Sequence, residues 1–337
     1  MRDGHWMVAW AILTVVVETA TAQPFGSPGR LTAVRRDANT SGFGYYEYVP
    51  HDYSTAKKWP LVLSLHGTGE KGDGNAGLYK VLNAGVPVLF KANMDTSKAN
   101  DTRQPFVLVA PQDSSGFVAA DRVWALVEYA KARYSVDTNR VYVTGLSAGG
   151  GTTWGFLNKY GSRLAAAAPI CGAGSVSFDS RALQTLPIWA VHAFNDPTVG
   201  LTRSLSNVDR IAKGTDSAIR VYPSGTSLRV SPGTHTLQFD PATRLWTRDS
   251  GFVAPRQRLA LTIYENGGHN SWTRTYANPV FWSWLLAQDR TKVPTGVGVW
   301  ARPEAESRRR VGFTATGLGL GALQPGDVDA LGRQPRR

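Results

Sequence analysis

The feature that most constrains the fold of this chain is a succession of short apolar runs that alternate with segments of helical spacing. Each run is flanked by Gly, Pro or Asn, and the runs cover residues 61–65, 106–110, 141–144, 188–191 and 261–264. Continuous apolar runs of this length are typical of parallel strands that are buried on both faces of a sheet. We therefore expect an α/β fold with a mostly parallel central sheet and helices on both faces.

Three segments between or after these runs carry helical patterns. Apolar side chains recur at helical spacing from Val123 to Tyr134, so a helix is predicted between the second and third runs. A second helix is predicted over 152–160. Asn278 followed by Pro279 is typical of a helix N-cap and first turn, and the apolar stripe that follows closes at Gln288.

The first residues have the layout of a secretory signal. Residues 6–17 form an apolar run, and small residues precede Gln23. The run is shorter than the roughly 20 residues that span a bilayer. We expect 1–22 to be a signal peptide cleaved near Ala22, which predicts an extracellular or periplasmic protein with no membrane span in the mature chain. An uncleaved anchor is the alternative.

The rest of the chain divides by composition. Residues 23–40 form an N-terminal lead, and 41–290 are predicted to be the catalytic domain. Within it, 220–258 alternates polar and apolar residues with turn signals, which predicts an insertion, either hairpins at the sheet edge or a lid over a pocket. Residues 291–337 are rich in Gly and Pro and carry an Arg run at 308–310, which predicts a disordered basic tail.

Composition excludes several kinds of site and partner. Cys171 is the single cysteine, so neither an intramolecular disulfide nor a site built from several thiolates can form, and we expect this thiol to be buried and inert. The net charge of +12 suits an anionic partner. No nucleic-acid-binding motif accompanies it, so we expect a basic exported protein with no specific nucleic-acid partner.

Residues 145–149 form the motif Gly-Leu-Ser-Ala-Gly, with Ser147 at its centre, directly after the apolar run at 141–144. A nucleophile at a sharp strand-to-helix turn needs very small residues two positions before and after it, so that strand and helix can pass closely. The helix N-terminus then directs unpaired N–H groups at the reacting oxygen. Ser147 is the candidate nucleophile; an idle serine in a glycine-rich turn is the alternative.

A serine hydroxyl becomes a good nucleophile when a base removes its proton. His269 follows the last apolar run through a Gly-Gly turn, where the base is expected when the order along the chain is Ser, acid, His. His192 lies within a run and is interpreted as a packed residue. His235 lies in the irregular stretch, and His51 precedes the sheet. His269 is therefore the candidate general base.

The acid must orient the imidazole and stabilise its cation. Asp196 follows the run at 188–191, in an Asn-Asp-Pro sequence that is also an ordinary turn. Asp240, in the insertion, and Glu265, at the last run, are the rivals. Position at a strand end and order along the chain favour Asp196.

The loop after the first run is the candidate oxyanion hole. Where a serine nucleophile sits at a strand-to-helix turn of this type, one backbone N–H comes from this loop and the other from the residue after the nucleophile. These are Thr68 and Ala148. His66 is interpreted as a structural histidine that pins the loop.

Five motifs occur in one order along the chain, at residues 65–72, 110–112, 145–150, 169–172 and 268–272. Together they resemble the secreted α/β-hydrolase esterases grouped with polyhydroxybutyrate depolymerases, feruloyl esterases and prolyl-oligopeptidase-like carboxylesterases. The resemblance implies the α/β-hydrolase fold and ester hydrolysis without a metal or other cofactor. It implies Ser147 as nucleophile, Asp196 as acid and His269 as base.

The same resemblance implies that Gln112, Trp124 and Trp272 line the substrate cleft. Two features depart from the group. The chain has His192-Ala193 where the group often has His-Gly, which loosens the assignment of the acid, and 220–258 is longer than usual.

These inferences predict a secreted serine esterase that cleaves small-molecule or polymeric carboxylic esters through an acyl-enzyme. A serine peptidase of prolyl-oligopeptidase type and a non-catalytic polymer-binding protein are the alternatives.

Overall fold

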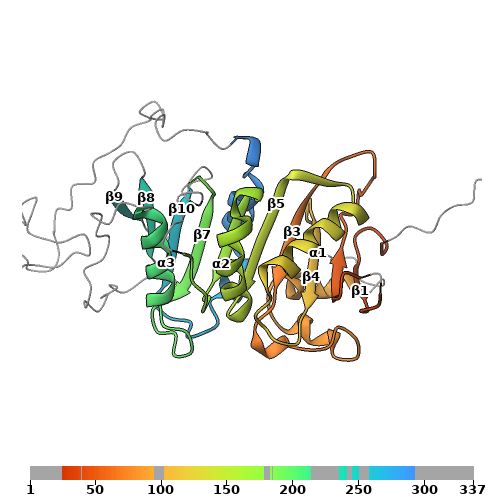
Figure 1. Ribbon diagram of the computed structural model, residues 1–337, viewed down its shortest axis with the longest axis horizontal. Helices are drawn as coiled ribbons and strands as arrows, with labels where there is room; N and C mark the ends of the chain where they lie inside the picture. Colours follow the sequence, from red (N-terminus) through yellow and green to blue (C-terminus); the bar gives the residue numbers. More distant parts are fainter. Residues whose placement is uncertain are drawn as a thin grey trace, which may run out of the picture.

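The computed structural model describes residues 25–38, 40–94, 102–177, 183, 185–213, 235–240, 245–249 and 258–292. The strands of these residues form one sheet in the order β1-β2-β4-β3-β5-β6-β7-β10-β8-β9 (Figure 1). Their bounds are β1 Leu31–Val34, β2 Gly44–Tyr48, β3 Trp59–Leu65, β4 Val107–Gln112, β5 Val136–Leu146, β6 Ala166–Ile170, β7 Ile188–Ala193, β8 His235–Asp240, β9 Leu245–Asp249 and β10 Leu259–Tyr264.

The centre of the sheet, from β4 to β10, is parallel. Every residue of β3, β4, β7 and β10 is buried, because helices cover both faces. All of the predicted apolar runs are strands of this parallel centre. The prediction of a mostly parallel sheet is therefore confirmed.

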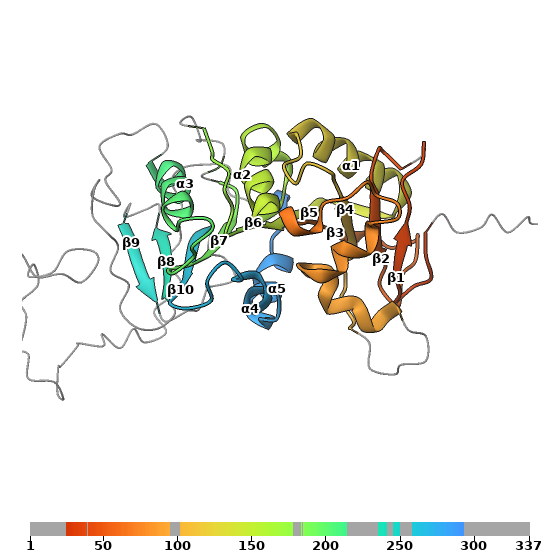
Figure 2. The same ribbon diagram turned by 90° about the horizontal axis from the view of Figure 1, so that it is seen from below.

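Helices pack on both faces of the sheet, as Figure 2 shows. One face carries α1 (Ala120–Arg133), α2 (Ala148–Tyr160) and α3 (Thr202–Lys213), and the other carries α4 (Trp272–Tyr276) and α5 (Pro279–Leu286). Single-turn and longer 3₁₀ segments are η1 Thr68–Glu70, η2 Leu78–Asn83, η3 Val86–Met94, η4 Gly161–Arg163 and η6 Arg290–Lys292.

The three predicted helices are present. The α5 helix begins as expected, because the Asn278 side chain accepts a hydrogen bond from Val280 N–H at 2.9 Å and Pro279 occupies the first turn. The α2 helix begins at Ala148 rather than at residue 152. Three consecutive glycines, 149–151, form its first turn, and the low helix propensity of glycine hid this turn from the sequence pattern.

Each helical layer buries its own apolar face against the sheet. The α1 side chains Val123, Leu126, Val127 and Ala130 belong to one hydrophobic cluster. Phe281, Trp284 and Leu285 of α5 belong to another on the opposite face. The sheet is thus held between two cores, which leaves the ends of its strands as the place where loops can carry polar chemistry.

Several elements escaped the sequence analysis. The strand β1 pairs antiparallel with β2, β2 pairs antiparallel with β4, and α3 covers β7 and β10. Glu47 of β2 is buried, and its carboxylate accepts hydrogen bonds from Tyr134 Oη–H and Gly26 N–H. A buried carboxylate with dedicated donors cannot be recognised from local sequence.

The described part of 220–258 forms the strands β8 and β9, which extend the sheet antiparallel beyond β10. This part lies at the sheet edge, the first of the two places that the sequence left open. Residues 1–22 and those beyond 292 lie outside the described residues. None of the helices that the structure describes is both long and apolar enough to cross a membrane.

Candidate active site

Ser147 is the single residue between a strand and the helix that follows it. The strand β5 ends at Leu146 and α2 begins at Ala148, and Ser147 has φ of +52°. A side chain at Gly145 would place its Cβ 2.5 Å from Gly149 O. Such contacts are far too close, so residue 145 must lack a side chain. The left-handed conformation of a non-glycine residue stores strain and presents the Ser147 hydroxyl at the apex of the turn.

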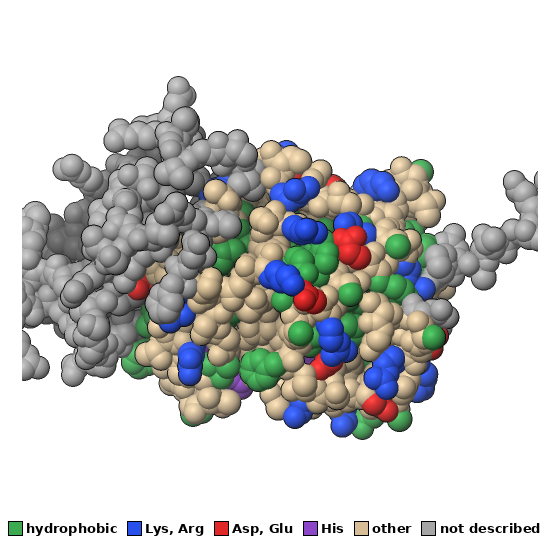
Figure 3. Space-filling model, in the orientation of Figure 1, with side chains coloured by type: hydrophobic (Ala, Val, Ile, Leu, Met, Phe, Trp, Pro, Cys, Tyr) green, Lys and Arg blue, Asp and Glu red, His purple; other side chains and the backbone are tan. Residues whose placement is uncertain are grey.

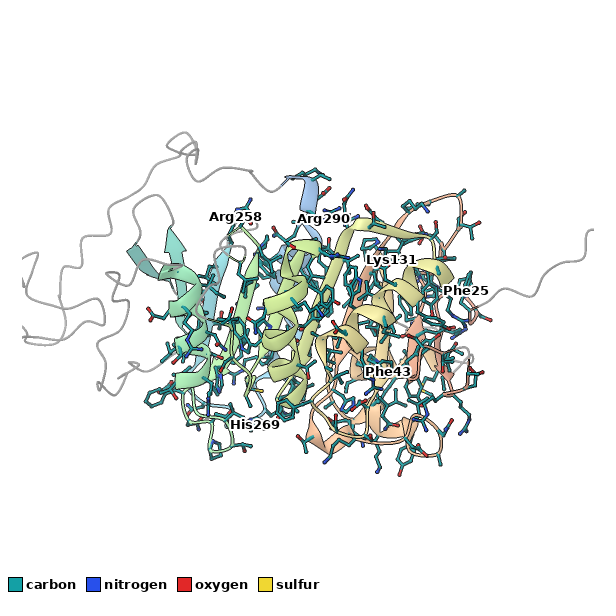
Figure 4. The ribbon with its side chains drawn as sticks, in the orientation of Figure 1. Phe25, Phe43, Lys131, Arg258, His269 and Arg290 are labelled. Carbon is teal, nitrogen blue, oxygen red and sulfur yellow. The ribbon has the colours of Figure 1, made fainter. Side chains whose placement is uncertain are left out.

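Three side chains from separate loops meet at this turn. Ser147 Oγ lies 2.8 Å from His269 Nε2, and His269 Nδ1 lies 2.8 Å from Asp196 Oδ2. They follow β5, β10 and β7, whose carboxyl ends share one edge of the sheet. Figure 4 labels His269 at this edge. The carboxylate in contact with His269 is therefore Asp196 rather than one of the two rivals.

The Asp196 carboxylate is enclosed by donors. Its side chain is 0% exposed, and Oδ1 accepts hydrogen bonds from the N–H groups of Thr198 at 2.8 Å and Val199 at 2.9 Å. Burial alone would raise the pKa of Asp196. Hydrogen bonds from His192 and His269 and from the backbone outweigh burial and hold this pKa well below its usual range. The carboxylate stays charged, as the partner of an imidazolium must.

His269 is held from two sides but remains open to solvent, with 21% of its side chain exposed. Gly267 and Gly268 have positive φ, and Gly268 N–H donates to Asn195 Oδ1 at 3.0 Å, which ties this loop to the Asp196 loop. The ring of Trp272 meets that of His269 edge to face, with 5.5 Å between centroids. Along the lower edge of Figure 3, a histidine and hydrophobic side chains reach the surface.

Each of the two predicted oxyanion donors is the first residue of a helical segment. Ala148 is buried and is the first residue of α2, and Thr68 is exposed and is the first residue of η1. The first N–H groups of a helix have no partner within that helix. A Cβ built on Gly67 would lie 3.4 Å from the Cβ of Ser147, so the backbone of this loop passes directly beside the nucleophile.

His66 pins the loop that carries Thr68. His66 Nδ1 lies 2.6 Å from Gly67 O, and Nε2 accepts a hydrogen bond from Asp113 N–H at 2.9 Å. The ring thus connects the ends of β3 and β4. This is the structural role that the sequence suggested.

Gln112 is a correction to the expected cleft. Its amide is buried, and it donates to Glu70 O and Gly77 O while accepting from Gly74 N–H at 2.9 Å. All of these partners belong to the glycine-rich loop after β3. Gln112 therefore supports that loop from beneath and does not line a cleft.

Trp124 is a second correction. Its ring stacks on Tyr160, with 5.0 Å between centroids and 8° between planes. Tyr160 is the last residue of α2, while Ser147 precedes the first. At about 1.5 Å rise per residue, the length of α2 therefore separates Trp124 from Ser147. Of the three expected cleft residues, Trp272 is the one that contacts the triad.

His192 is the residue that the sequence analysis undervalued. It is fully buried in β7, as a packed histidine would be, but its Nε2 lies 3.3 Å from Asp196 Oδ2. The signal was the spacing: a histidine four residues before an aspartate at the end of a strand. Nothing in the sequence alone says that the intervening turn brings the two together.

Cys171 lies beneath the site. Its Sγ, an Asp196 oxygen and a ring nitrogen of His269 all lie within 4.8 Å of one another, and within the described ranges this is the one group of three or more His, Cys, Asp or Glu side chains that could hold a metal ion. His269 and Asp196 already bond each other directly. Burial raises the pKa of the Cys171 thiol to about 12, so the thiol is protonated and a poor ligand at neutral pH. The group is best described as part of the Ser–His–Asp site.

Comparison with known proteins adds to this geometry. A sequence model of the Dienelactone hydrolase family matches residues 79–226, which include Ser147 and Asp196. A solved structure, a thermostable esterase, superposes with a TM-score of 0.50 at 25% identity, covering 77% of this chain and 63% of that one. The chain has the α/β-hydrolase fold.

One curated relative is also similar. A bifunctional acetylxylan esterase/xylanase, XynS20E of Neocallimastix patriciarum, is 29% identical over 164 residues, which are 46% of this chain and 22% of that protein. The chain thus matches less than a quarter of this relative and less than two thirds of the thermostable esterase.

Proposed function

We propose that this protein is a serine esterase that hydrolyses carboxylic esters through an acyl-enzyme. The observation that carries the proposal is the unbroken line of two 2.8 Å contacts from Ser147 Oγ through His269 to the buried Asp196 carboxylate. The similarity to esterases supports the same reaction class.

In the proposed reaction, Ser147 Oγ attacks the ester carbonyl while His269 Nε2 takes its proton. The backbone N–H groups of Thr68 and Ala148 bind the oxyanion, each contributing about 3 kcal/mol of transition-state stabilisation. His269 then gives its proton to the departing alcohol. It next removes a proton from water as the water oxygen attacks the acyl carbonyl, and returns that proton to Ser147 Oγ as the bond from Oγ to the acyl carbon breaks and the acid leaves. Asp196 stays ionised and stabilises the imidazolium throughout.

Export is part of the proposal. A chain with the predicted signal at 1–22 would act outside the cytoplasm on small or polymeric esters. Within the esterases, the motif pattern favours the group that contains feruloyl esterases and polyhydroxybutyrate depolymerases.

The test compares the mature protein with Ser147→Ala, first on p-nitrophenyl acetate and then on a Pro-linked p-nitroanilide. We expect ester turnover to fall by about 10⁶, or roughly 8 kcal/mol, in the variant. A fluorophosphonate probe should label the wild type and not the variant. Full activity in Ser147→Ala would overturn the mechanism. Preferential cleavage of the amide would make the protein a peptidase, and a wild type without labelling or turnover would make it a binding protein.

A further inference from the structure

The structure places a second histidine on the catalytic acid. His192 is 0% exposed and extends from β7 toward α3. Its Nε2 lies 2.7 Å from Val199 O and 3.3 Å from Asp196 Oδ2. The oxygen Oδ2 is the one that accepts from His269 Nδ1. Two imidazoles, one buried and one at the surface, therefore share a single carboxylate oxygen.

The partners of His192 determine where its proton lies. A carbonyl and a carboxylate can only accept hydrogen bonds, so Nε2 carries the hydrogen and shares it between Val199 O and Asp196 Oδ2. The opposite nitrogen, Nδ1, lies 2.8 Å from Ser204 Oγ on α3. The Ser204 hydroxyl can donate to Nδ1 of the neutral ring, which fixes this tautomer.

These contacts close the turn that carries the acid. Asp196 Oδ1 accepts from Thr198 N–H and Val199 N–H, and His192 binds the Val199 carbonyl from the other side. The turn is thereby wrapped around the carboxylate and clamped to β7. An apolar side chain in place of His192 would leave Val199 O without this donor and would remove one of the contacts that orient the carboxylate.

We propose that His192 is a positioning residue for the reaction: it fixes the direction in which Asp196 Oδ2 faces His269, and Ser204 holds His192 in the tautomer that does so. The inference rests on the proposed esterase function. It goes beyond packing because it assigns the effect to one hydrogen, that on Nε2, and to one oxygen of Asp196.

The test uses substitutions that keep or remove that hydrogen. The amide nitrogen of His192→Gln can take the place of Nε2, whereas that of His192→Asn reaches only the place of Nδ1. We expect kcat for p-nitrophenyl acetate to fall about 10²-fold in His192→Asn, as for a misplaced catalytic group, and to recover to within about tenfold of the wild type in His192→Gln. KM should change little in either variant, since neither contacts substrate.

Non-additivity separates positioning from general destabilisation. In an Asp196→Asn background, His192→Asn should cost almost nothing more in kcat, because the carboxylate through which it acts has been removed. The matched control is Asn207→Ala, which removes a buried side chain on α3 that bonds Val176 N–H and Gly174 O. This control should lower the melting temperature and leave kcat unchanged.

Four outcomes would overturn the inference: wild-type kcat in His192→Asn, equal kcat in the Asn and Gln variants, losses that multiply in the Asp196→Asn background, or an equal loss in Asn207→Ala. If His192→Asn does not fold, Ser204→Ala carries the test. A fall in its kcat that disappears in the Asp196→Asn background supports the inference, and wild-type kcat overturns it.

Fluorophosphonate labelling keeps the two hypotheses apart. A wild type that does not label at Ser147 would refute the esterase mechanism itself. A wild type that labels, with His192→Asn labelling at the same rate, would refute only the role of His192.

Discussion

The loop after β3 and the turn after β7, on the two sides of the candidate active site, are each held by a buried histidine, but their aspartates have different partners. On one side a buried histidine at the end of β3, His66, bonds the loop that carries Thr68 and the backbone of Asp113. On the other a buried histidine in β7, His192, bonds the turn that carries Asp196. Each side also holds a buried aspartate, Asp113 or Asp196, whose pKa is lowered by its hydrogen bonds.

The difference between the sides is what the aspartate faces. Asp113 Oδ2 is paired with Arg122 of α1 at 2.6 Å, and Asp113 Oδ1 accepts from Ser115 N–H, so this carboxylate is paired with a cation and not with a histidine. Asp196 directs Oδ2 at His269 and through it at Ser147. The comparison teaches that a buried aspartate at a strand end can pair with a cation, as Asp113 does with Arg122, or face a second histidine, as Asp196 does with His269.

Among the variants that compare the two sides, the largest difference is expected when each aspartate is changed to asparagine. Asp196→Asn should lower kcat about 10⁴-fold, since an amide cannot stabilise the imidazolium and favours the wrong tautomer of His269. Asp113→Asn should cost far less, because it touches no member of the triad. Steady-state kinetics on p-nitrophenyl acetate provide the measurement. Similar losses of kcat in Asp196→Asn and Asp113→Asn would show that the two aspartates do not differ in their importance for the reaction.

Removing the histidine of the loop side should have a smaller effect. In His66→Ala the Gly67 carbonyl and the Asp113 N–H lose their partner, so the loop beside Ser147 is less ordered. We expect kcat to fall about 10²-fold, comparable to the loss of one oxyanion donor, and the free energy of unfolding to fall by about 1–3 kcal/mol.

The control for His66→Ala is Asn93→Ala. Asn93 is buried in η3 and bonds Gly29 O at 2.9 Å and Thr102 O at 2.8 Å, away from the site. The Asn93→Ala variant should lose a similar amount of unfolding free energy and keep the wild-type kcat. A wild-type kcat in His66→Ala would show that the hydrogen bonds of His66 are not needed to order the loop that carries Thr68.

The two tryptophans offer a finer contrast. Trp272 packs edge to face on His269, so Trp272→Ala should lower kcat/KM about tenfold, the upper range for an aromatic pair. Trp124 stacks on Tyr160 at the other end of α2, so Trp124→Ala should lower the melting temperature and leave kcat/KM unchanged. A fall in kcat/KM for Trp124→Ala would support the original prediction that Trp124 lines the substrate cleft.

The smallest expected effect is on the free energy of unfolding at acid pH, and both Asp113 and Asp196 should contribute to it. Because the pKa values of Asp113 and Asp196 are lowered by folding, each charge stabilises the folded protein fully above the unfolded pKa of about 3.9. This contribution is lost as pH falls through the lower folded pKa. In urea titrations, the difference in unfolding free energy between wild type and Asp113→Asn or Asp196→Asn should be constant above about pH 5 and shrink below about pH 4. A difference that already shrinks between pH 7 and 5 would contradict the lowered pKa values.

The sequence by itself determined the parallel centre of the sheet and the turn at Ser147. Both follow from local rules: apolar runs must be buried on both faces, and the glycines at 145 and 149 are needed where strand and helix pass. It also put His269 and Asp196 at the ends of strands, where the structure brings them to Ser147.

Only the tertiary structure decided what the polar residues around them contact. Gln112, Trp124 and His192 were each assigned from motif or position. The partners of Gln112 and Trp124 lie far away in the chain, while those of His192 are brought to it by the turn after β7 and by α3. Gln112 bonds a loop more than 30 residues earlier in the sequence, and Trp124 stacks on Tyr160 in the next helix. A buried polar group needs a hydrogen-bond partner, and its role depends on which group that is. The packing of the strands and helices, rather than the local sequence, determines this partner.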